Sequence, residues 1–193
     1  MKTLQVIYST ESDKPSTVET DTYRVDHVPY HGFSRGLGEF AELTIPMVKG
    51  DYPWILIQPA DNELNYDEAV AACLASPYHH FGFSLSDDSY ASHGHVYRGG
   101  QPDGWREVPF YDHAMFYSLE FYKMFSPHFR ESKSFWGLDL LSCFFHRNLY
   151  GKPCAVYCGA ELRHTKPIES NTWCIDGRSP DQEMAMIRAK YGI

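Results

Sequence analysis

The chain has 193 residues, of which 43% are hydrophobic and 22% are charged, and this composition excludes a disordered protein. Its 17 basic and 25 acidic residues give a formal net charge of −8. This charge argues against a protein whose main function is to bind the nucleic-acid backbone, because phosphate binding needs a basic surface. The apolar runs are too short to span a membrane, and no leader-like stretch follows Met1. We therefore expect one cytoplasmic domain with no membrane span, and we do not expect nucleic acid as a partner.

Alternating strands and helices are predicted along the chain. Apolar runs predict strands at residues 4–8, 22–28, 52–58, 78–85, 107–111 and 155–158. Apolar faces behind capping residues predict helices at residues 34–49, 66–75, 113–125, 134–148 and from 179 onward. The polar stretches at residues 11–20 and 86–104 are predicted as loops, and long loops are often functional. This order indicates an α/β domain with a mostly parallel sheet flanked by helices.

The five cysteines form an odd set without paired C-x-x-C spacing, which makes a zinc finger or a disulfide scaffold a poor interpretation. We expect them to be reduced thiols, most of them small core residues. Cys73 and Cys143 fall on apolar helix faces, where a thiol is normally inert.

Asp61-Asn62-Glu63 directly follows the apolar strand at 52–58. Two carboxylates spaced i, i+2 at a strand end can reach one hard cation, which takes its remaining ligands from water and a diphosphate. The alternative is a solvated turn in which Asp61 or Asn62 caps the following segment.

Two further motifs lie in the second half of the chain. Trp136-Gly137-Leu138-Asp139 heads a predicted helix, where the helix dipole favours an ionised Asp139 that could accept a proton from a hydroxyl group. His164-Thr165-Lys166 places an imidazole, which is a common ligand of transition metals, close to a cationic side chain. The alternatives are an aspartate that stabilises its own helix and a surface histidine beside a basic turn.

In order and spacing, these motifs resemble the GT-A-fold glycosyltransferases, in which a D-x-D turn holds a divalent metal on the diphosphate of a sugar nucleotide. The resemblance covers roughly residues 4–167, with Asp61-x-Glu63 in place of two aspartates. It implies a single GT-A-like, Rossmann-like domain over residues 1–193. Within it, about 1–85 form the nucleotide-sugar half, about 86–170 form the acceptor and catalytic half, and 171–193 form a C-terminal tail helix.

The resemblance also implies roles for individual residues. The metal, Mn²⁺ or Mg²⁺, would be held by Asp61, Glu63 and His164. Asp139 would be the catalytic base, and the nucleotide-sugar donor would be bound by Ser9, Thr10, Arg35 and Lys166. The acceptor would be a saccharide or another hydroxyl compound. This interpretation requires Asp61 and His164 to meet in one cleft.

Two other functions remain open from the sequence. A metal-dependent hydrolase could be built from a cluster of histidines and aspartates, namely His79, His80, His93, His95, His113, Asp87 and Asp88. A catalytically inactive GT-A-like module that binds a nucleotide or a protein is the third possibility.

Overall fold

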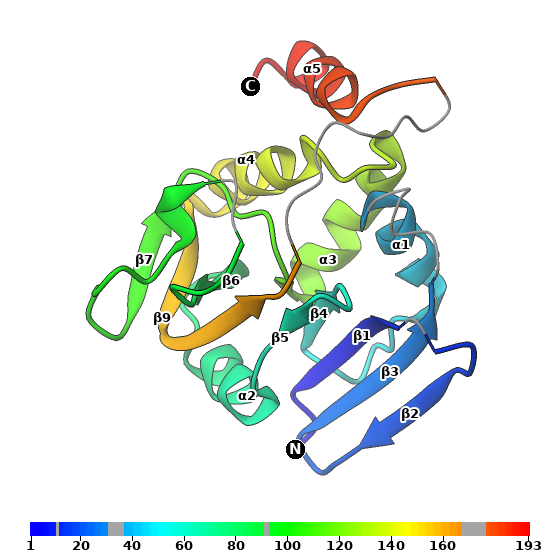
Figure 1. Ribbon diagram of the computed structural model, residues 1–193, viewed down its shortest axis with the longest axis vertical. Coiled ribbons are helices and arrows are strands. Elements are labelled where there is room, and N and C mark those ends of the chain that lie inside the picture. Colours follow the sequence, from blue (N-terminus) through cyan, green and yellow to red (C-terminus); the bar gives the residue numbers. More distant parts are fainter. Residues whose placement is uncertain (11, 31–36, 91–92, 167–176) are drawn as a thin grey trace.

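A computed structural model describes residues 1–10, 12–30, 37–90, 93–166 and 177–193. Nine strands form one sheet with helices packed around it (Figure 1). The strands are β1 (Leu4–Thr10), β2 (Ser16–Glu19), β3 (Tyr23–Pro29), β4 (Trp54–Gln58), β5 (Asn62–Glu63), β6 (His80–Leu85), β7 (Trp105–Val108), β8 (Met115–Ser118) and β9 (Cys154–His164). The α-helices are α1 (Leu37–Thr44), α2 (Tyr66–Ala75), α3 (Leu119–Phe125), α4 (Leu138–Tyr150) and α5 (Pro180–Tyr191). Short 3-10 turns lie at Ile45–Met47, Gly94–Val96 and Ser126–Glu131.

The sheet is mixed rather than mostly parallel, which corrects the prediction made from the sequence. Its strand order is β2-β3-β1-β4-β8-β6-β9-β5, with β7 also paired to β9. β1 runs parallel to β3 and β4, and β6 runs parallel to β9, but β8 is antiparallel to both β4 and β6. The prediction missed β8 because its four residues, all buried, read as the first turn of a helix at 113–125.

Two other elements differ from the prediction. β9 continues to His164, well beyond the predicted strand at 155–158, and this extension pairs with β5. β2 lies inside the stretch predicted as a loop and pairs antiparallel with β3. The short, exposed β2 carries no apolar run that a sequence pattern would detect.

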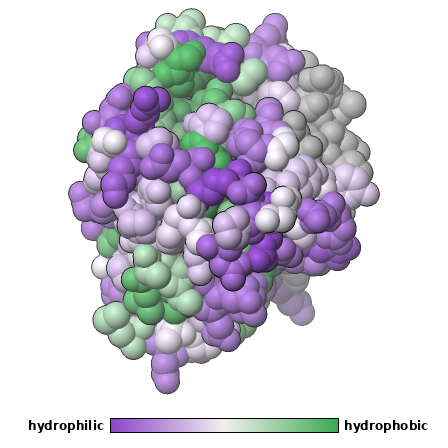
Figure 2. Space-filling view, turned by 90° about the vertical axis from the view of Figure 1, so that its left-hand side faces the viewer, coloured by the Kyte–Doolittle hydropathy of each residue, from purple (hydrophilic) through white to green (hydrophobic). Residues whose placement is uncertain are grey.

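A continuous hydrophobic core fills the space between the sheet and the helices. All six residues of β6 are buried, and since side chains of a strand alternate between faces, the sheet is covered on both faces here. α3 packs against β4 and β8, α4 against β6 and β9, and α2 against β1 and β9. Figure 2 shows one face of the molecule, which is mostly hydrophilic with smaller apolar areas toward the α5 end and the α2 end. None of the described helices is both long and apolar enough to cross a membrane.

The chain entering α4 is fixed by α5. Glu183 is 2% exposed, and its carboxylate accepts hydrogen bonds from the Ser132 hydroxyl and from the N–H groups of Lys133 and Ser134, at 2.9, 3.1 and 2.9 Å. Gly137, the N-cap of α4, has φ of 87°, a conformation that disfavours any side chain. These contacts set where the first turn of α4 begins and therefore where Asp139 lies.

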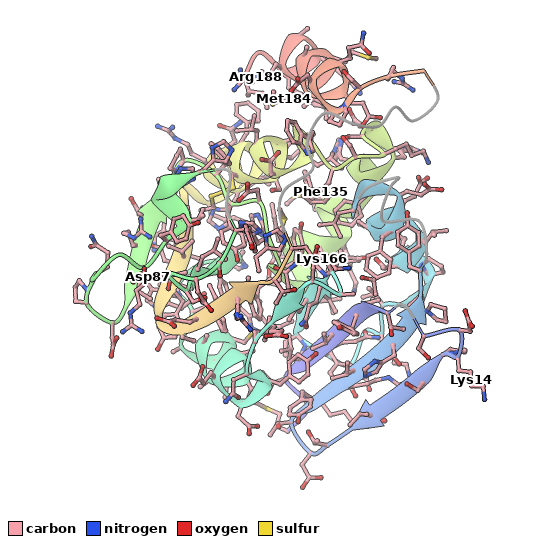
Figure 3. The ribbon with its side chains drawn as sticks, in the orientation of Figure 1. Lys14, Asp87, Phe135, Lys166, Met184 and Arg188 are labelled. Atoms are coloured by element: carbon pink, nitrogen blue, oxygen red, sulfur yellow. A yellow bond between two sulfur atoms is a disulfide. The ribbon has the colours of Figure 1, made fainter. Side chains whose placement is uncertain are left out.

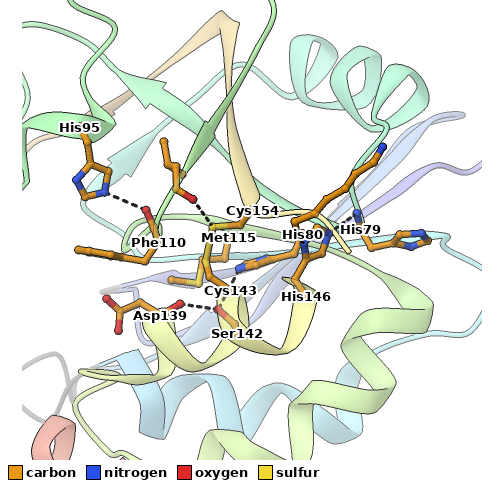
Figure 4. Close-up of a disulfide and its surroundings, with 12 residues drawn as sticks. His79, His80, His95, Phe110, Met115, Asp139, Ser142, Cys143, His146 and Cys154 are labelled. Atoms are coloured by element: carbon orange, nitrogen blue, oxygen red, sulfur yellow. Dashed lines mark hydrogen bonds between the residues drawn. A yellow bond between two sulfur atoms is a disulfide. The ribbon is translucent and has the colours of Figure 1, made fainter. Parts of the chain in front are cut away.

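Cys143 of α4 and Cys154 of β9 form a disulfide, which corrects the expectation that these cysteines are reduced (Figure 4). Cys73 and Cys158 are free and buried, as expected of small core residues. Cys174 lies outside the described residues. The disulfide ties the helix that begins beside Asp139 to the strand that ends at His164.

Candidate functional site

The side chains of Asp61 and His164 lie against each other, with Oδ2 of Asp61 3.4 Å from Nε2 of His164. Asn62 of β5 pairs with His164 of β9. The N–H and the hydroxyl of Thr165 both donate to the carbonyl of Asp61, at 2.8 and 3.1 Å. The turn after β4 is thus bound to the end of β9, and Asp61 and His164 lie side by side, as the predicted metal site requires.

The two side chains stabilise each other in the charged form. Burial by itself raises the pKa of Asp61, but the hydrogen bond and charge of His164 outweigh it and leave that pKa below its usual value. Burial likewise opposes the charge on His164, yet Asp61 and the carbonyl of Tyr90, 2.6 Å from Nδ1, raise its pKa above the usual value. The pair is therefore a carboxylate–imidazolium ion pair in mildly acidic solution.

Asp112 and His113 lie beside this pair, in the segment that leads into β8. The rings of His113 and His164 are 5.0 Å apart, and Nε2 of His113 is 3.4 Å from Oδ1 of Asp112. Burial lowers the pKa of His113 more than Asp112 and Asp61 raise it. Asp112 is not among the residues predicted from the sequence, because only the antiparallel direction of β8 brings the start of that strand to the edge where β4 ends.

Asp139 lies in the first turn of α4, where its Oδ1 accepts a hydrogen bond from the N–H of Gly137 at 2.9 Å. Burial, followed by the negative charge of Asp112, raises the pKa of Asp139 to about 7. This rise is opposite in direction to the lowering of the pKa expected from the helix dipole, because burial and a like charge outweigh the backbone N–H groups. A carboxyl group that titrates near neutrality is suited to accept or donate a proton.

Asp112 connects the two parts of the site. Its charge raises the pKa of both Asp139 and His164, so it lies within electrostatic reach of each. Two carboxylates and two imidazoles from three separate segments thus gather at one edge of the sheet, and Asp139 of α4 lies within electrostatic reach of one of them. Clusters of titratable groups with shifted pKa values are typical of functional sites.

The predicted donor-binding residues have different surroundings. Ser9 is fully buried, and its Oγ accepts a hydrogen bond from the N–H of Ala60 at 3.0 Å, so this hydroxyl supports the turn that carries Asp61. Thr10 is half-buried and accepts a hydrogen bond from the N–H of Ser12 at 3.1 Å. Lys166 is exposed at the end of β9, near the middle of the molecule in Figure 3. Arg35 lies outside the described residues.

Glu63 does not join Asp61 and His164. Its exposed carboxylate is 3.4 Å from Nη1 of Arg163, whose Nε donates to Asp88 at 2.9 Å. Across the described ranges, no group of three or more His, Cys, Asp or Glu side chains is placed to hold a metal ion. Of the three predicted ligands, Asp61 and His164 lie together, 3.4 Å apart, whereas Glu63 lies apart from them. The ligand roles of these residues remain a prediction.

The histidines of the hydrolase alternative do not gather in one place. Both ring nitrogens of His80 are engaged, with the carbonyl of Phe116 at 2.9 Å and Oγ of Ser142 at 3.0 Å. The ring of His79 stacks on Tyr150 at 3.9 Å. Figure 4 shows His79 and His80 on one side of the disulfide and His95 on the other.

A separate groove of about 350 Å³ lies between α4, α5 and β7. It is lined partly by apolar side chains, including Leu140 and Phe144, with Arg147 and Arg188 also present. None of the clustered carboxylates and imidazoles lines it, so we place the candidate site at the Asp61–His164 edge.

Comparison with known proteins gives no family. No family model matches the chain, and no curated protein matches it significantly. Among solved structures, it is similar to the crystal structure of A197 from STIV, with 16% sequence identity and a TM-score of 0.37, over 94% of this chain and 92% of that chain.

Proposed function

We propose that the chain is a glycosyltransferase that moves a sugar from a nucleotide-sugar donor to an acceptor hydroxyl. The observation that carries the proposal is the contact between Asp61 and His164 beyond the carboxyl end of β4. Asp112 links this contact to Asp139, because its charge raises the pKa of both His164 and Asp139. Open α/β sheets bind ligands outside the carboxyl ends of strands where the strand order reverses. β1 lies between β3 and β4, both parallel to it, so this edge meets that condition.

The donor diphosphate would lie beside Asp61 and His164. A protein with a net charge of −8 must supply positive charge locally, and Lys166 would provide it just beyond the end of β9. Mn²⁺ or Mg²⁺ held by Asp61 and His164 would neutralise the diphosphate as it leaves. His164 must lose its proton before it can bind a metal. In acid the protonated His164 would therefore pair with Asp61, and at higher pH the two side chains would be free to hold the metal together.

Asp139 would act on the acceptor. Its carboxylate takes the proton of the acceptor hydroxyl while the acceptor oxygen bonds to the anomeric carbon and the bond from that carbon to the diphosphate oxygen breaks. The pKa of about 7 keeps a useful fraction ionised at neutral pH and makes the group basic enough to accept the proton. Asp112 supports this role by its nearby negative charge.

Release of nucleoside diphosphate tests the proposal. The protein is incubated with UDP-glucose, UDP-galactose, UDP-N-acetylglucosamine, GDP-mannose and dTDP-glucose in the presence of Mn²⁺ and a mixture of methyl glycosides. We expect release from at least one donor, reduced at least about a hundredfold in Asp139→Asn and in Asp61→Asn. Asp21→Asn, at an exposed turn before β3, is the matched control and should behave as the wild type. Absence of release from every donor, or full activity in both variants, contradicts the proposal.

Thermal stabilisation separates the enzyme from an inactive binding module. An active transferase and a binding module should both be stabilised by a nucleoside diphosphate with Mn²⁺, and in both cases Asp61→Asn should remove the effect. Only the transferase also releases the diphosphate from a donor.

A further inference from the structure

We propose that His93, Phe110, Asp112 and His113 form an acceptor recess that binds a sugar through its hydroxyl groups. The proposal rests on the proposed function for the reaction that follows binding, but the binding itself is tested without any donor.

The wall of the acceptor recess is built from aromatic rings. The ring of Phe110 meets the rings of His93 and His95 edge-on, each at 4.7 Å. Nε2 of His95 hydrogen-bonds to the carbonyl of Phe110 at 3.0 Å, a contact drawn in Figure 4. The main chain at Phe110 is therefore held in place, and its ring offers an apolar surface of the kind that packs against the C–H groups of a sugar ring.

Polar groups lead from the surface inward along this wall. Oδ2 of Asp112 is 3.9 Å from Nε2 of His93, and its Oδ1 is 3.4 Å from Nε2 of His113. The side chains of His93, Asp112 and His113 are 42%, 17% and 5% exposed. A hydroxyl-bearing ligand that enters past His93 would thus meet the carboxylate first and His113 last.

His113 supplies the observation that points to a ligand. Its Nε2 is buried and makes no hydrogen bond with the part of the chain that the structure describes. Leaving a buried polar group without a partner is costly, so such an atom in a folded protein calls for an explanation. A hydroxyl group both donates and accepts, and it can be the hydrogen-bond partner of His113.

The charges around the acceptor recess select the ligand class. The Asp112 carboxylate lies beside both His93 and His113, and its negative charge disfavours an anionic ligand such as a phosphate at this point. A neutral polyol carries no such penalty, and its hydroxyl groups match the carboxylate. Asp139 lies within electrostatic reach of Asp112, so an acceptor sugar held here would have its hydroxyl groups close to the proposed base.

Binding of methyl glycosides provides the test. Methyl glucoside, galactoside and mannoside, each as both anomers, are added to the full chain with ¹⁵N-labelled histidine, and the ring signals are followed by NMR. We expect at least one glycoside to shift the signals of His113 and His93, while those of His80 and His146 in the core remain unchanged. His113→Phe should weaken this binding about tenfold, the effect of losing one hydrogen bond of ordinary strength.

His128→Phe is the matched control, since His128 lies beside Glu131 and Tyr191 and takes no part in the acceptor recess. Asp112→Asn is the second variant, and it should also weaken binding. Failure of every glycoside to bind the wild type, or unchanged binding in both His113→Phe and Asp112→Asn, overturns the proposal. A glycoside that binds as expected to a protein that releases no nucleoside diphosphate leaves the acceptor recess standing and removes the proposed function.

Discussion

The carboxylate of Asp61 faces the imidazole of His164 across 3.4 Å, although the two residues come from opposite halves of the chain. The pairing of β5 with the end of β9 brings them together, so the contact exists only in the folded protein. Each group shifts the pKa of the other toward the charged form. The stability of the fold must therefore depend on the protonation of this pair.

The pair should stabilise the protein most between about pH 4 and 6.5. Because the pKa of Asp61 is lowered on folding, its contribution is present above the unfolded value of about 3.9 and is lost as the pH falls through the folded pKa. Because the pKa of His164 is raised, its contribution is present below the unfolded value of about 6.5 and is lost as the pH rises through the folded pKa. We expect Asp61→Asn to lower the free energy of unfolding by about 1–3 kcal/mol at pH 5.5 and by less at pH 8.5.

Urea unfolding at the two pH values measures this difference. Glu63→Gln is the control, since Glu63 and Arg163 form an exposed ion pair that should contribute little at either pH. If Asp61→Asn loses the same free energy of unfolding at pH 5.5 and at pH 8.5, the ion pair with protonated His164 does not contribute to stability.

Asp139 should have the opposite effect on stability. Burial, and then the charge of Asp112, raise its pKa to about 7, whereas in the unfolded chain it ionises near 3.9. The folded state thus holds the proton more tightly, and stability falls as the pH rises from about 4 to 7. Asp139→Asn should remove this decline, so that the variant gains stability relative to the wild type at pH 8 but not at pH 4.

Titration of the Asp139 carboxyl carbon by ¹³C NMR gives an independent check. In Asp112→Asn the pKa of Asp139 should fall, because a nearby like charge has been removed, but burial should keep it above 3.9. If the transferase proposal is correct, the pH profile of the reaction should move in the same direction. A pKa of Asp139 that is unaffected by Asp112→Asn is inconsistent with the arrangement described here.

Sequence reasoning located the parts of the site that follow strand ends. Asp61 follows the apolar β4, and the sequence predicts that such a position lies at the ligand-binding edge of a sheet. His164 was singled out only by the family resemblance, because the strand predicted from the sequence ended at residue 158, whereas β9 continues to His164. Asp139 was found because Trp136-Gly137 precedes an apolar helix. The raised pKa of Asp139 could not be predicted from the sequence, because the burial of this side chain and its proximity to the charge of Asp112 depend on tertiary packing.

β8 and Asp112 were missed for the same reason. Met115–Ser118 is a short apolar run that could equally begin a helix, and periodicity does not separate the two. When this run is interpreted as a helix, the sheet has no β8 and no antiparallel strand at this position. Asp112 is then not expected at the edge where β4 ends. The disulfide was missed for a related reason, since Cys143 and Cys154 meet only once α4 packs against β9.

Reduction of the Cys143–Cys154 bond should destabilise the protein. The two cysteines are 11 positions apart, and a cross-link over a loop of that length contributes about 3 kcal/mol by restricting the unfolded chain. We expect the Cys143→Ala, Cys154→Ala double variant to lose about this much free energy of unfolding, as measured by urea titration. Thiol counting on the denatured wild type, without reductant, should find neither of these two cysteines reactive.

Cys73→Ala serves as the control for removing a buried sulfur that is not cross-linked. Adding a reductant should lower the stability of the wild type and of Cys73→Ala by similar amounts, but should not affect the double variant. Equal sensitivity to reductant in all three proteins would contradict the cross-link.

Gly82 of β6 should be essential for the position of Asp112 and His113. A Cβ atom at this position would overlap the ring of Tyr111, which is fully buried against the strand. Gly82→Ala must therefore displace Tyr111, and with it the two residues that follow, at a cost of about 1–3 kcal/mol in the free energy of unfolding. Gly50→Ala is the matched control, because a Cβ there meets no atom within 4 Å. Urea unfolding measures the loss of stability, and the NMR signals of the histidine rings report the displacement. In Gly82→Ala the signal of His113 should move and that of His146 should not. A Gly82→Ala protein as stable as Gly50→Ala would mean that Tyr111 does not pack on β6.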